Sequence, residues 1–177
     1  MPFDARFPHV LNPRILQVLQ VWLAAAGRAA MPRRSAIDPA ALGRNLDIVW
    51  LCDVVRPGPR YRYRLAGERV NEVYGMSLAG RFMDEIIPAA TQTPVLARYH
   101  RVVAERGLSH TAGSLYLSSD KIYAGERIAM PLSDDGRTVD ALLGATAFDW
   151  PTAARRSEQR AVGPTVTFTP IDLPEAP

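Results

Sequence analysis

The sequence predicts an α+β fold: a five-stranded antiparallel sheet with short helices on one face, preceded by an amphipathic helix. Five segments are rich in β-branched and aromatic residues, two before and three after a stretch with helical patterns. No helical pattern separates the last three segments, so we expect them to form an antiparallel meander. The 177 residues are 47 % hydrophobic and 22 % charged, a composition typical of one globular domain with flanking segments.

The first two strands are predicted to form a hairpin. Residues 47–55 are β-branched and aromatic, and residues 60–66 alternate between an aromatic face and an arginine face. Between them, Pro57, Gly58 and Pro59 favour a turn, which brings the two segments side by side.

The remaining elements follow in order along the chain. Short helical patterns cover residues 67–75 and 81–87, and the pair Thr93-Pro94 predicts a longer helix over residues 94–106 with Pro94 at its first position. The last three strands are expected at residues 109–117, 123–132 and 138–150. The proline-rich residues 151–177 are expected to form a flexible tail, with Thr165–Thr169 as a possible short strand.

Residues 1–32 are interpreted as an N-terminal helical extension of a domain formed by residues 33–150. Asn12 as N-cap, Pro13 at the first position and Gly27 past the end delimit a helix, and these signals favour it over a cleavable signal peptide. Its apolar face must dock on the body or on a second copy of the chain. We expect a homodimer through this face, formed by Ile15, Leu19, Trp22 and Leu23.

Composition excludes several classes of protein. The net charge of +3 comes from residues 1–46, with six arginines against two acids, whereas residues 47–150 carry twelve basic against thirteen acidic side chains. A nucleic-acid partner is therefore not expected for the body of the domain. The single cysteine, Cys52, excludes an internal disulfide framework. No apolar stretch is long enough to cross a membrane, and we expect a cytoplasmic location.

One segment carries a family resemblance. Residues 63–88 read YRLAGERVNEVYGMSLAGRFMDEIIP, and this order of strand, short helices, glycines and a final Ile-Pro resembles the signature region of PAS domains. The matching positions are Leu65, Asn71, Tyr74, Gly75, Leu78, Gly80, Ile86 and Pro88. Together with the preceding segment, the chain resembles a family of short, stand-alone bacterial PAS-like proteins over residues 33–150.

The resemblance implies a non-enzymatic sensory or interaction module in bacterial signal transduction. Such a module would bind a small ligand in a cavity between sheet and helices, contact an unidentified signalling protein, or do both. The residues expected to line the cavity, each with plain core packing as its alternative, are Trp50, Tyr63, Tyr74, Tyr99, Met130 and Phe148.

The sequence requires no cofactor, but haem or another small ligand stays open. Haem-binding PAS domains use a proximal histidine on the helix that corresponds to residues 94–106, which makes His100 the candidate ligand. Its alternative is a histidine that packs at the helix edge or faces water. The histidines share no spacing typical of a metal site, so no metal is expected.

Three arginines on one strand face form the most unusual local feature. Arg60, Arg62 and Arg64 could bind an anion, a nucleic-acid backbone or an acidic partner, or could be a solvent-facing row paired with Asp47 or Asp53 across the hairpin. An Arg-mediated anion or nucleic-acid binder is one alternative function. The other is a cone-shaped α+β enzyme, such as an isomerase or dehydratase, which would need a buried Asp/His pair facing the cavity.

Overall fold

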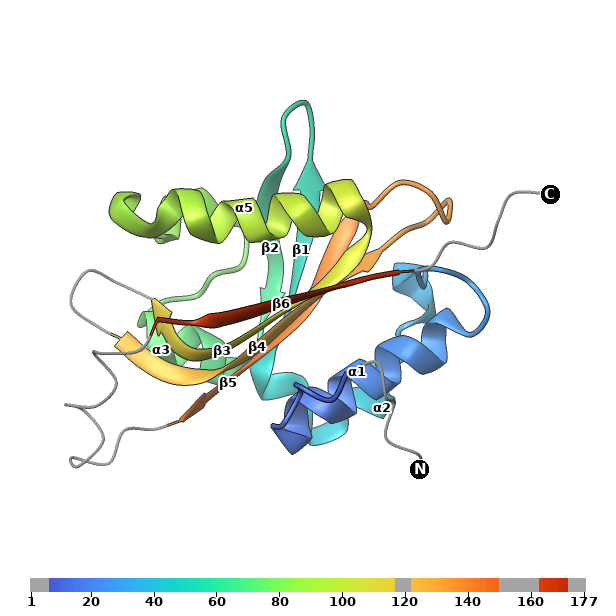
Figure 1. The fold of residues 1–177 in the computed structure, drawn as a ribbon, viewed down its shortest axis with the longest axis horizontal. Helices are drawn as coiled ribbons and strands as arrows, with labels where there is room; N and C mark the ends of the chain where they lie inside the picture. Colours follow the sequence, from blue (N-terminus) through green and yellow to red (C-terminus); the bar gives the residue numbers. More distant parts are fainter. Residues whose placement is uncertain (1–6, 117–121, 150–162, 172–177) are drawn as a thin grey trace.

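The computed structural model describes residues 7–116, 122–149 and 163–171, and its centre is a single antiparallel sheet (Figure 1). The strand order is β2-β1-β5-β4-β3-β6. Every neighbouring pair is antiparallel, which, with the helices on the faces of the sheet, confirms the predicted α+β class. The strands are β1 (Val49–Val55), β2 (Arg60–Ala66), β3 (Gly107–Tyr116), β4 (Ile122–Leu132), β5 (Ala141–Asp149) and β6 (Thr165–Pro170).

The sheet has six strands where five were expected. The additional strand is β6, which pairs with β3 from Ala112↔Thr165 to Gly107↔Pro170 and lies where a possible short strand was predicted. The hairpin of β1 and β2 is confirmed, and β2 has the predicted bounds. β1 begins two residues later than predicted, because residues Gly43–Ile48 form a 3-10 helix.

Three helices connect the two outer parts of the sheet. β2 and β3 lie far apart in the strand order, so the segment between them crosses one face of the sheet (Figure 1). It contains α3 (Glu68–Tyr74), α4 (Met83–Ile86) and α5 (Ala89–Glu105).

The predicted start of the long helix is wrong. α5 begins at Ala89, and Pro94 lies inside it. Proline lacks the N–H that would bond the carbonyl of Ala90, but Pro94 is exposed, so that carbonyl can bond water instead. The first turn starts earlier, where the Thr91 N–H donates to the Pro88 carbonyl at 2.9 Å.

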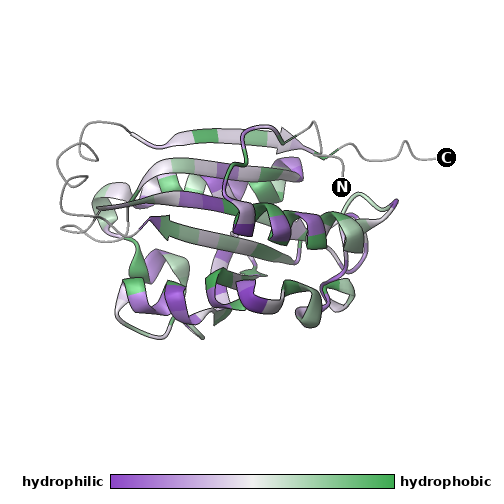
Figure 2. Cartoon of the chain, turned by 90° about the horizontal axis from the view of Figure 1, so that it is seen from below, coloured by the Kyte–Doolittle hydropathy of each residue, from purple (hydrophilic) through white to green (hydrophobic). Residues whose placement is uncertain are grey.

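Both faces of the sheet are covered, so the protein has two hydrophobic cores. α1 (Pro13–Ala26) and α2 (Pro39–Leu42) cover one face, and α3, α4 and α5 cover the other. Strand residues alternate between the two cores: Ile128 and Met130 of β4 face α1, whereas Ala129 faces α5. Hydrophobic and hydrophilic residues also alternate along the helices, as amphipathic packing on a sheet requires (Figure 2).

The capping signals of α1 are confirmed. The Asn12 side chain accepts hydrogen bonds from the N–H groups of Arg14 and Ile15. At the other end, the Gly27 N–H donates to the Leu23 carbonyl, and Gly27 has a positive φ of 57°. Of the helices in the described ranges, none is long and apolar enough to cross a membrane.

The apolar face of α1 docks on the body of the same chain. Ile15, Leu19 and Trp22 are at most 2 % exposed, and the Trp22 indole N–H donates to the Pro131 carbonyl at 2.9 Å. The prediction that these three side chains form a dimer contact is therefore wrong, because the sheet already covers them. Leu23 is half-buried at the edge of the same core. Homodimerisation itself stays a prediction.

Candidate functional site

An arginine lies between the sheet and α5, in a layer that is otherwise largely apolar. Arg127 of β4 donates from Nε to the Thr146 hydroxyl at 3.0 Å, and the Trp50 indole N–H donates to that same oxygen at 3.0 Å. Thr146 is fully buried on β5, directly opposite Arg127. The shared acceptor thus fixes the direction of the guanidinium group.

Tyrosines surround the rest of this guanidinium group. Nη1 of Arg127 lies 3.4 Å from the Tyr99 hydroxyl, and a hydrogen bond also links Arg127 to Tyr74. Burial raises the pKa of both Tyr63 and Tyr74, so these phenols are neutral at physiological pH. Burial alone lowers the pKa of Arg127, but the surrounding tyrosine hydroxyls raise it overall. The arginine is therefore a cation held by neutral partners.

A small enclosed cavity opens beside Arg127. The volume open to the centre of a water molecule is about 10 Å³, roughly what one water requires. Its walls come from α5, β3 and β4, so it lies between the helix and the sheet. The lining residues are Val95, Arg98, Tyr99, Ser109, Thr111, Arg127 and Ala129.

Four of the six residues predicted to line a cavity gather around Arg127. The Trp50 ring centroid lies 6.2 Å from that of Tyr63 and 5.9 Å from that of Tyr99, and Tyr74 packs against the same core. Tyr99 lines the cavity itself, whereas Trp50, Tyr63 and Tyr74 are not among its lining residues. Whether a ligand binds there stays a prediction.

The other two predicted lining residues lie elsewhere. Met130 is fully buried in the core on the α1 side, because it is an odd number of residues away from Arg127 along β4. Phe148 lies near the end of β5, where its ring contacts that of Tyr123 at 6.1 Å. Neither residue lines the cavity.

The central residues of the site were missed by sequence reasoning. These are Arg98, Ser109, Thr111, Arg127 and Thr146. A signal was present in the adjacent charged pair Glu126-Arg127, inside an otherwise apolar strand segment. Adjacent strand residues point to opposite faces, so if both faces of the sheet are covered, one charge must enter each core.

Glu126 holds the N-terminal segment on the opposite face of β4. Its two carboxylate oxygens accept the backbone N–H groups of Leu11 at 3.1 Å and Asn12 at 2.9 Å. His110 Nε2 lies 3.0 Å from Oε1, within ion-pair distance but without the alignment of a hydrogen bond, and the His9 ring lies 4.9 Å from the His110 ring. We call this group, His9, Leu11, Asn12, His110 and Glu126, the N-terminal clasp.

The N-terminal clasp contains the kind of residue pair that the alternative function, a cone-shaped α+β enzyme, would need. A buried carboxylate–histidine pair does exist, since His110 and Glu126 are both at most 9 % exposed. It faces the α1 side, however, and both carboxylate oxygens are occupied by backbone N–H groups. Burial lowers the pKa of His9, with the charge of His110 acting in the same direction. This geometry fits anchoring of the chain rather than proton transfer to a substrate.

His100 occupies a different place from the cavity. Its Nδ1 lies 2.7 Å from the Tyr61 hydroxyl, and the two ring centroids are 5.4 Å apart. The hollow beside it, about 340 Å³, is also lined by Arg60 and Asp84, which form an ion pair. A haem needs an apolar slot with a histidine nitrogen aimed into it. These residues do not fit one, so the geometry favours the alternative interpretation of His100, a histidine that packs at the helix edge.

Each arginine of the exposed row on β2 has a carboxylate partner. Arg60 Nε lies 2.9 Å from Asp84, while Arg62 and Arg64 lie 3.6 and 3.2 Å from Asp53 across the hairpin. Arg34 contacts the same Asp53 at 2.8 Å. Burial raises the pKa of Asp53, but Arg64 and Arg34 outweigh it and lower the pKa overall. The geometry favours the solvent-facing, paired interpretation.

Replacing Arg62 with alanine is expected to change the free energy of unfolding by less than about 1 kcal/mol. The guanidinium is half-exposed and lies 3.6 Å from Asp53, which keeps two other arginine partners. Urea denaturation at low and high salt measures the change. A loss of 2 kcal/mol or more would show that the row is a cooperative network.

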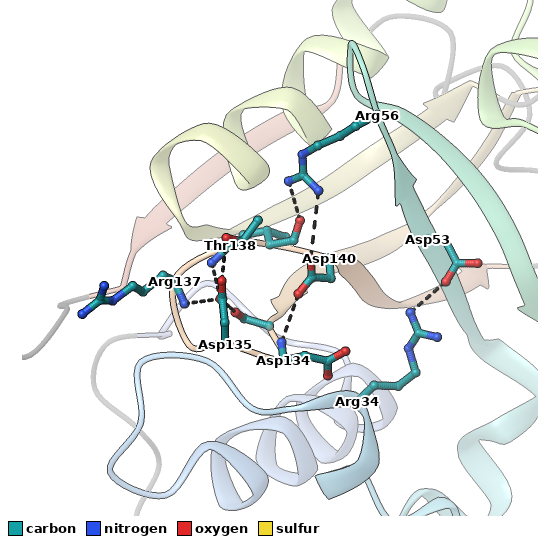
Figure 3. A network of polar contacts seen from close by, with 10 residues as sticks. Arg34, Asp53, Arg56, Asp134, Asp135, Arg137, Thr138 and Asp140 are labelled. Atoms are coloured by element: carbon teal, nitrogen blue, oxygen red, sulfur yellow. Dashed lines mark hydrogen bonds and ion pairs between the residues drawn. The ribbon is translucent and has the colours of Figure 1, made fainter.

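Carboxylates near the β4–β5 turn and at the start of α4 have structural roles. In the β4–β5 turn, Asp135 accepts the N–H groups of Thr138 and Arg137 at 2.6 and 2.7 Å, and these bonds lower its pKa (Figure 3). The N–H of Asp134 bonds the Asp140 carboxylate (Figure 3). Glu85 caps α4 by accepting the Phe82 N–H.

Cys52 is a core residue. It is fully buried in β1, and burial raises the pKa of its thiol, which disfavours the reactive thiolate. In the described part of the chain, no group of three or more His, Cys, Asp or Glu side chains is placed to hold a metal ion.

Comparison with solved structures finds proteins that are similar to part of this chain. The Rhodobacter sphaeroides LOV protein shares 13 % identity at a TM-score of 0.48, over 65 % of this chain and 66 % of that one. An RNA-binding Light-Oxygen-Voltage receptor shares 14 % identity at a TM-score of 0.40, over 64 % of this chain and 34 % of that one. The chain thus spans less than two thirds of either protein. A search of curated proteins found no match.

The family is shown by a comparison with sequence models. The model described as "PAS domain" matches residues 11–147. This range begins just before α1 and ends within β5. This range contains the cavity and most of the N-terminal clasp. The chain therefore belongs to the PAS domain family.

Proposed function

We propose that this PAS domain is a non-enzymatic sensory module of bacterial signalling, which binds a small ligand beside Arg127 and reports its presence through the N-terminal extension. PAS domains are typically sensory or signalling modules. The observation that supports this function is the placement of the cavity and the N-terminal clasp on opposite faces of the same two strands.

The two sites alternate residue by residue. On β4, Glu126 belongs to the clasp and Arg127 to the cavity. On β3, His110 belongs to the clasp, whereas Ser109 and Thr111 line the cavity. Thr111 pairs directly with Arg127 across the two strands. A shift of either strand on ligand binding therefore moves both sites together.

The output would be an interaction of the N-terminal extension with a signalling protein. α1 follows the clasp immediately, since Asn12 both bonds Glu126 and caps the helix. A ligand that changes the clasp would thus change the position of α1 on the sheet. The ligand can shift this equilibrium only by as much as its affinities for the two positions differ.

Removing hydrogen bonds around Arg127 is expected to weaken the hydrogen bonds of the N-terminal clasp. Arg127→Met removes the hydrogen bonds to Thr146 and Tyr99, and Tyr99→Phe removes one hydroxyl from α5 without touching β4. We expect the amide hydrogens of Leu11 and Asn12 to exchange about tenfold faster in Arg127→Met and about threefold faster in Tyr99→Phe. Hydrogen exchange followed by NMR measures both.

The matched control is Val102→Ala, a substitution on α5 that is fully buried but outside the cavity lining. It lowers global stability without altering the polar cluster. After correction for global stability, Val102→Ala should leave the exchange of Leu11 and Asn12 unchanged. Equal exchange in all three variants would contradict the proposed transmission.

A further inference from the structure

The ionic environment of Arg127 differs from that of the arginines on the surface. Arginines of the exposed faces, such as Arg14, Arg60, Arg69 and Arg101, each lie within ion-pair distance of a carboxylate. Arg127 is enclosed between sheet and helix, and among the described residues its hydrogen-bond partners are the hydroxyls of threonine and tyrosine. An enclosed charge that lacks an opposite charge is costly.

A second cation faces the same cavity. Arg98 of α5 is half-buried and lines the cavity opposite the sheet, and no carboxylate of the described residues forms an ion pair with it. Burial and the nearby charge of Arg127 both lower the pKa of Arg98. Two like charges at one cavity repel each other, and this repulsion would be relieved by an anion between them.

The remaining walls supply hydrogen-bond donors. The hydroxyls of Ser109, Thr111 and Tyr99 line the cavity with the two arginines, and Ser109 and Thr111 are buried. Guanidinium N–H groups and hydroxyls are the donors that proteins use to bind carboxylates and other small anions. The volume of about 10 Å³ admits a group of about the size of one water molecule.

We infer that the cavity is a binding site for a small monovalent anion, either a halide ion or the carboxylate group of a short organic acid. This inference rests on the proposed function, because it names the chemical class of the ligand. The anion would sit between Arg127, which Thr146 holds in place, and Arg98, which reaches in from α5. A halide ion fits the present volume more closely, whereas a carboxylate group is larger than one water molecule and requires an outward shift of the Arg98 side chain.

The test is an anion titration of the full chain in a buffer free of halides and carboxylates. Sodium chloride, formate and acetate are added separately up to 50 mM, about ten times a dissociation constant of roughly 5 mM, and the melting temperature Tm is measured. Ligand binding to the folded state raises Tm, and we expect a rise of about 3 °C or more for at least one anion. Chloride alone would identify a halide site, whereas formate or acetate would identify a carboxylate site.

Variants separate the site from general salt effects, which act on all proteins alike. Arg98→Met and Arg127→Met should lose the anion-dependent rise, corresponding to at least tenfold weaker binding. Arg62→Met removes an equal charge from the surface and should keep the full rise. Arg98→Met also covers the case in which Arg127→Met does not fold, because Arg98 is only half-buried on α5.

Two results would overturn the inference: no anion raises the Tm of the wild type beyond that of Arg98→Met, or Arg62→Met loses the rise equally. The hydrogen-exchange experiment above uses no anion, so the two proposals fail separately. If the cavity variants speed the exchange of Leu11 and Asn12 but no anion raises Tm, the sensory function is supported and its ligand belongs to another chemical class. If an anion raises Tm but the cavity variants leave the exchange of Leu11 and Asn12 unchanged, the cavity binds an anion without affecting the N-terminal clasp.

Discussion

Replacing Glu126 with alanine is expected to release the N-terminal segment from the sheet and to lower the free energy of unfolding by about 3–5 kcal/mol. Glu126 is 9 % exposed and accepts the N–H groups of Leu11 and Asn12. Without the carboxylate, two backbone donors lose their acceptor at once, and each unsatisfied group costs about 1–3 kcal/mol. The buried His110 ring also loses the carboxylate that lies within ion-pair distance of its Nε2.

Two measurements check this result. Urea denaturation gives the free energy of unfolding, and hydrogen exchange of Leu11 and Asn12 reports on the clasp itself. Glu126→Gln keeps the size of the side chain but offers one good acceptor oxygen in place of two, so an intermediate loss is expected.

Glu105→Ala is the matched control for Glu126→Ala. Glu105 is an exposed carboxylate near the end of α5, paired with Arg101 four residues earlier, and its loss should cost less than about 0.5 kcal/mol. If Glu126→Ala cost as little as Glu105→Ala, the clasp would be only a surface contact. Ligand binding beside Arg127 could then not be reported through the clasp as proposed.

The clasp also shows what the sequence could and could not predict. Local rules were sufficient for the pairing of β1 with β2, because the alternation of residues 60–66 and the intervening turn favour a hairpin. The register shift between Leu51 and Cys52 was not predicted. They were also sufficient for α1, where Asn12, Pro13 and Gly27 each take the expected capping position. They failed at Pro94, because an exposed proline is tolerated inside a helix when its free carbonyl can bond water.

The site depended on information that a single strand does not contain. The alternation along β4 separates Met130 from Arg127, but which face meets α5 is decided by the crossing of the helices, not by the strand. The hydrogen-bond partners of Arg127 come from β5, α3 and α5, which are far apart in the sequence. Only the Glu126-Arg127 pair gave a local sign that two buried charges lie back to back.

Replacing Gly144 with alanine is expected to cost about 3 kcal/mol, a drop in Tm of roughly 6–12 °C. Gly144 pairs with Trp50 across β1 and β5, and a Cβ atom there would lie 2.0 Å from Cζ2 of the indole. The indole cannot easily give way, because its N–H is bonded to Thr146 and its ring packs against Tyr63 and Tyr99. The same shift would disturb Thr146, which positions Arg127.

A double-mutant cycle identifies the cause of this loss. Trp50→Phe removes the atoms that the new Cβ would meet, so Gly144→Ala should cost at least 1.5 kcal/mol less in that background, as a coupling between contacting residues. Gly163→Ala is the control, since a Cβ there meets nothing within 4 Å, and it should change stability by less than about 0.5 kcal/mol. Purely additive costs would mean that Gly144 is required for the backbone of β5 rather than for the indole. The position of Thr146, and with it the direction of the Arg127 guanidinium, would then not depend on the packing of Trp50.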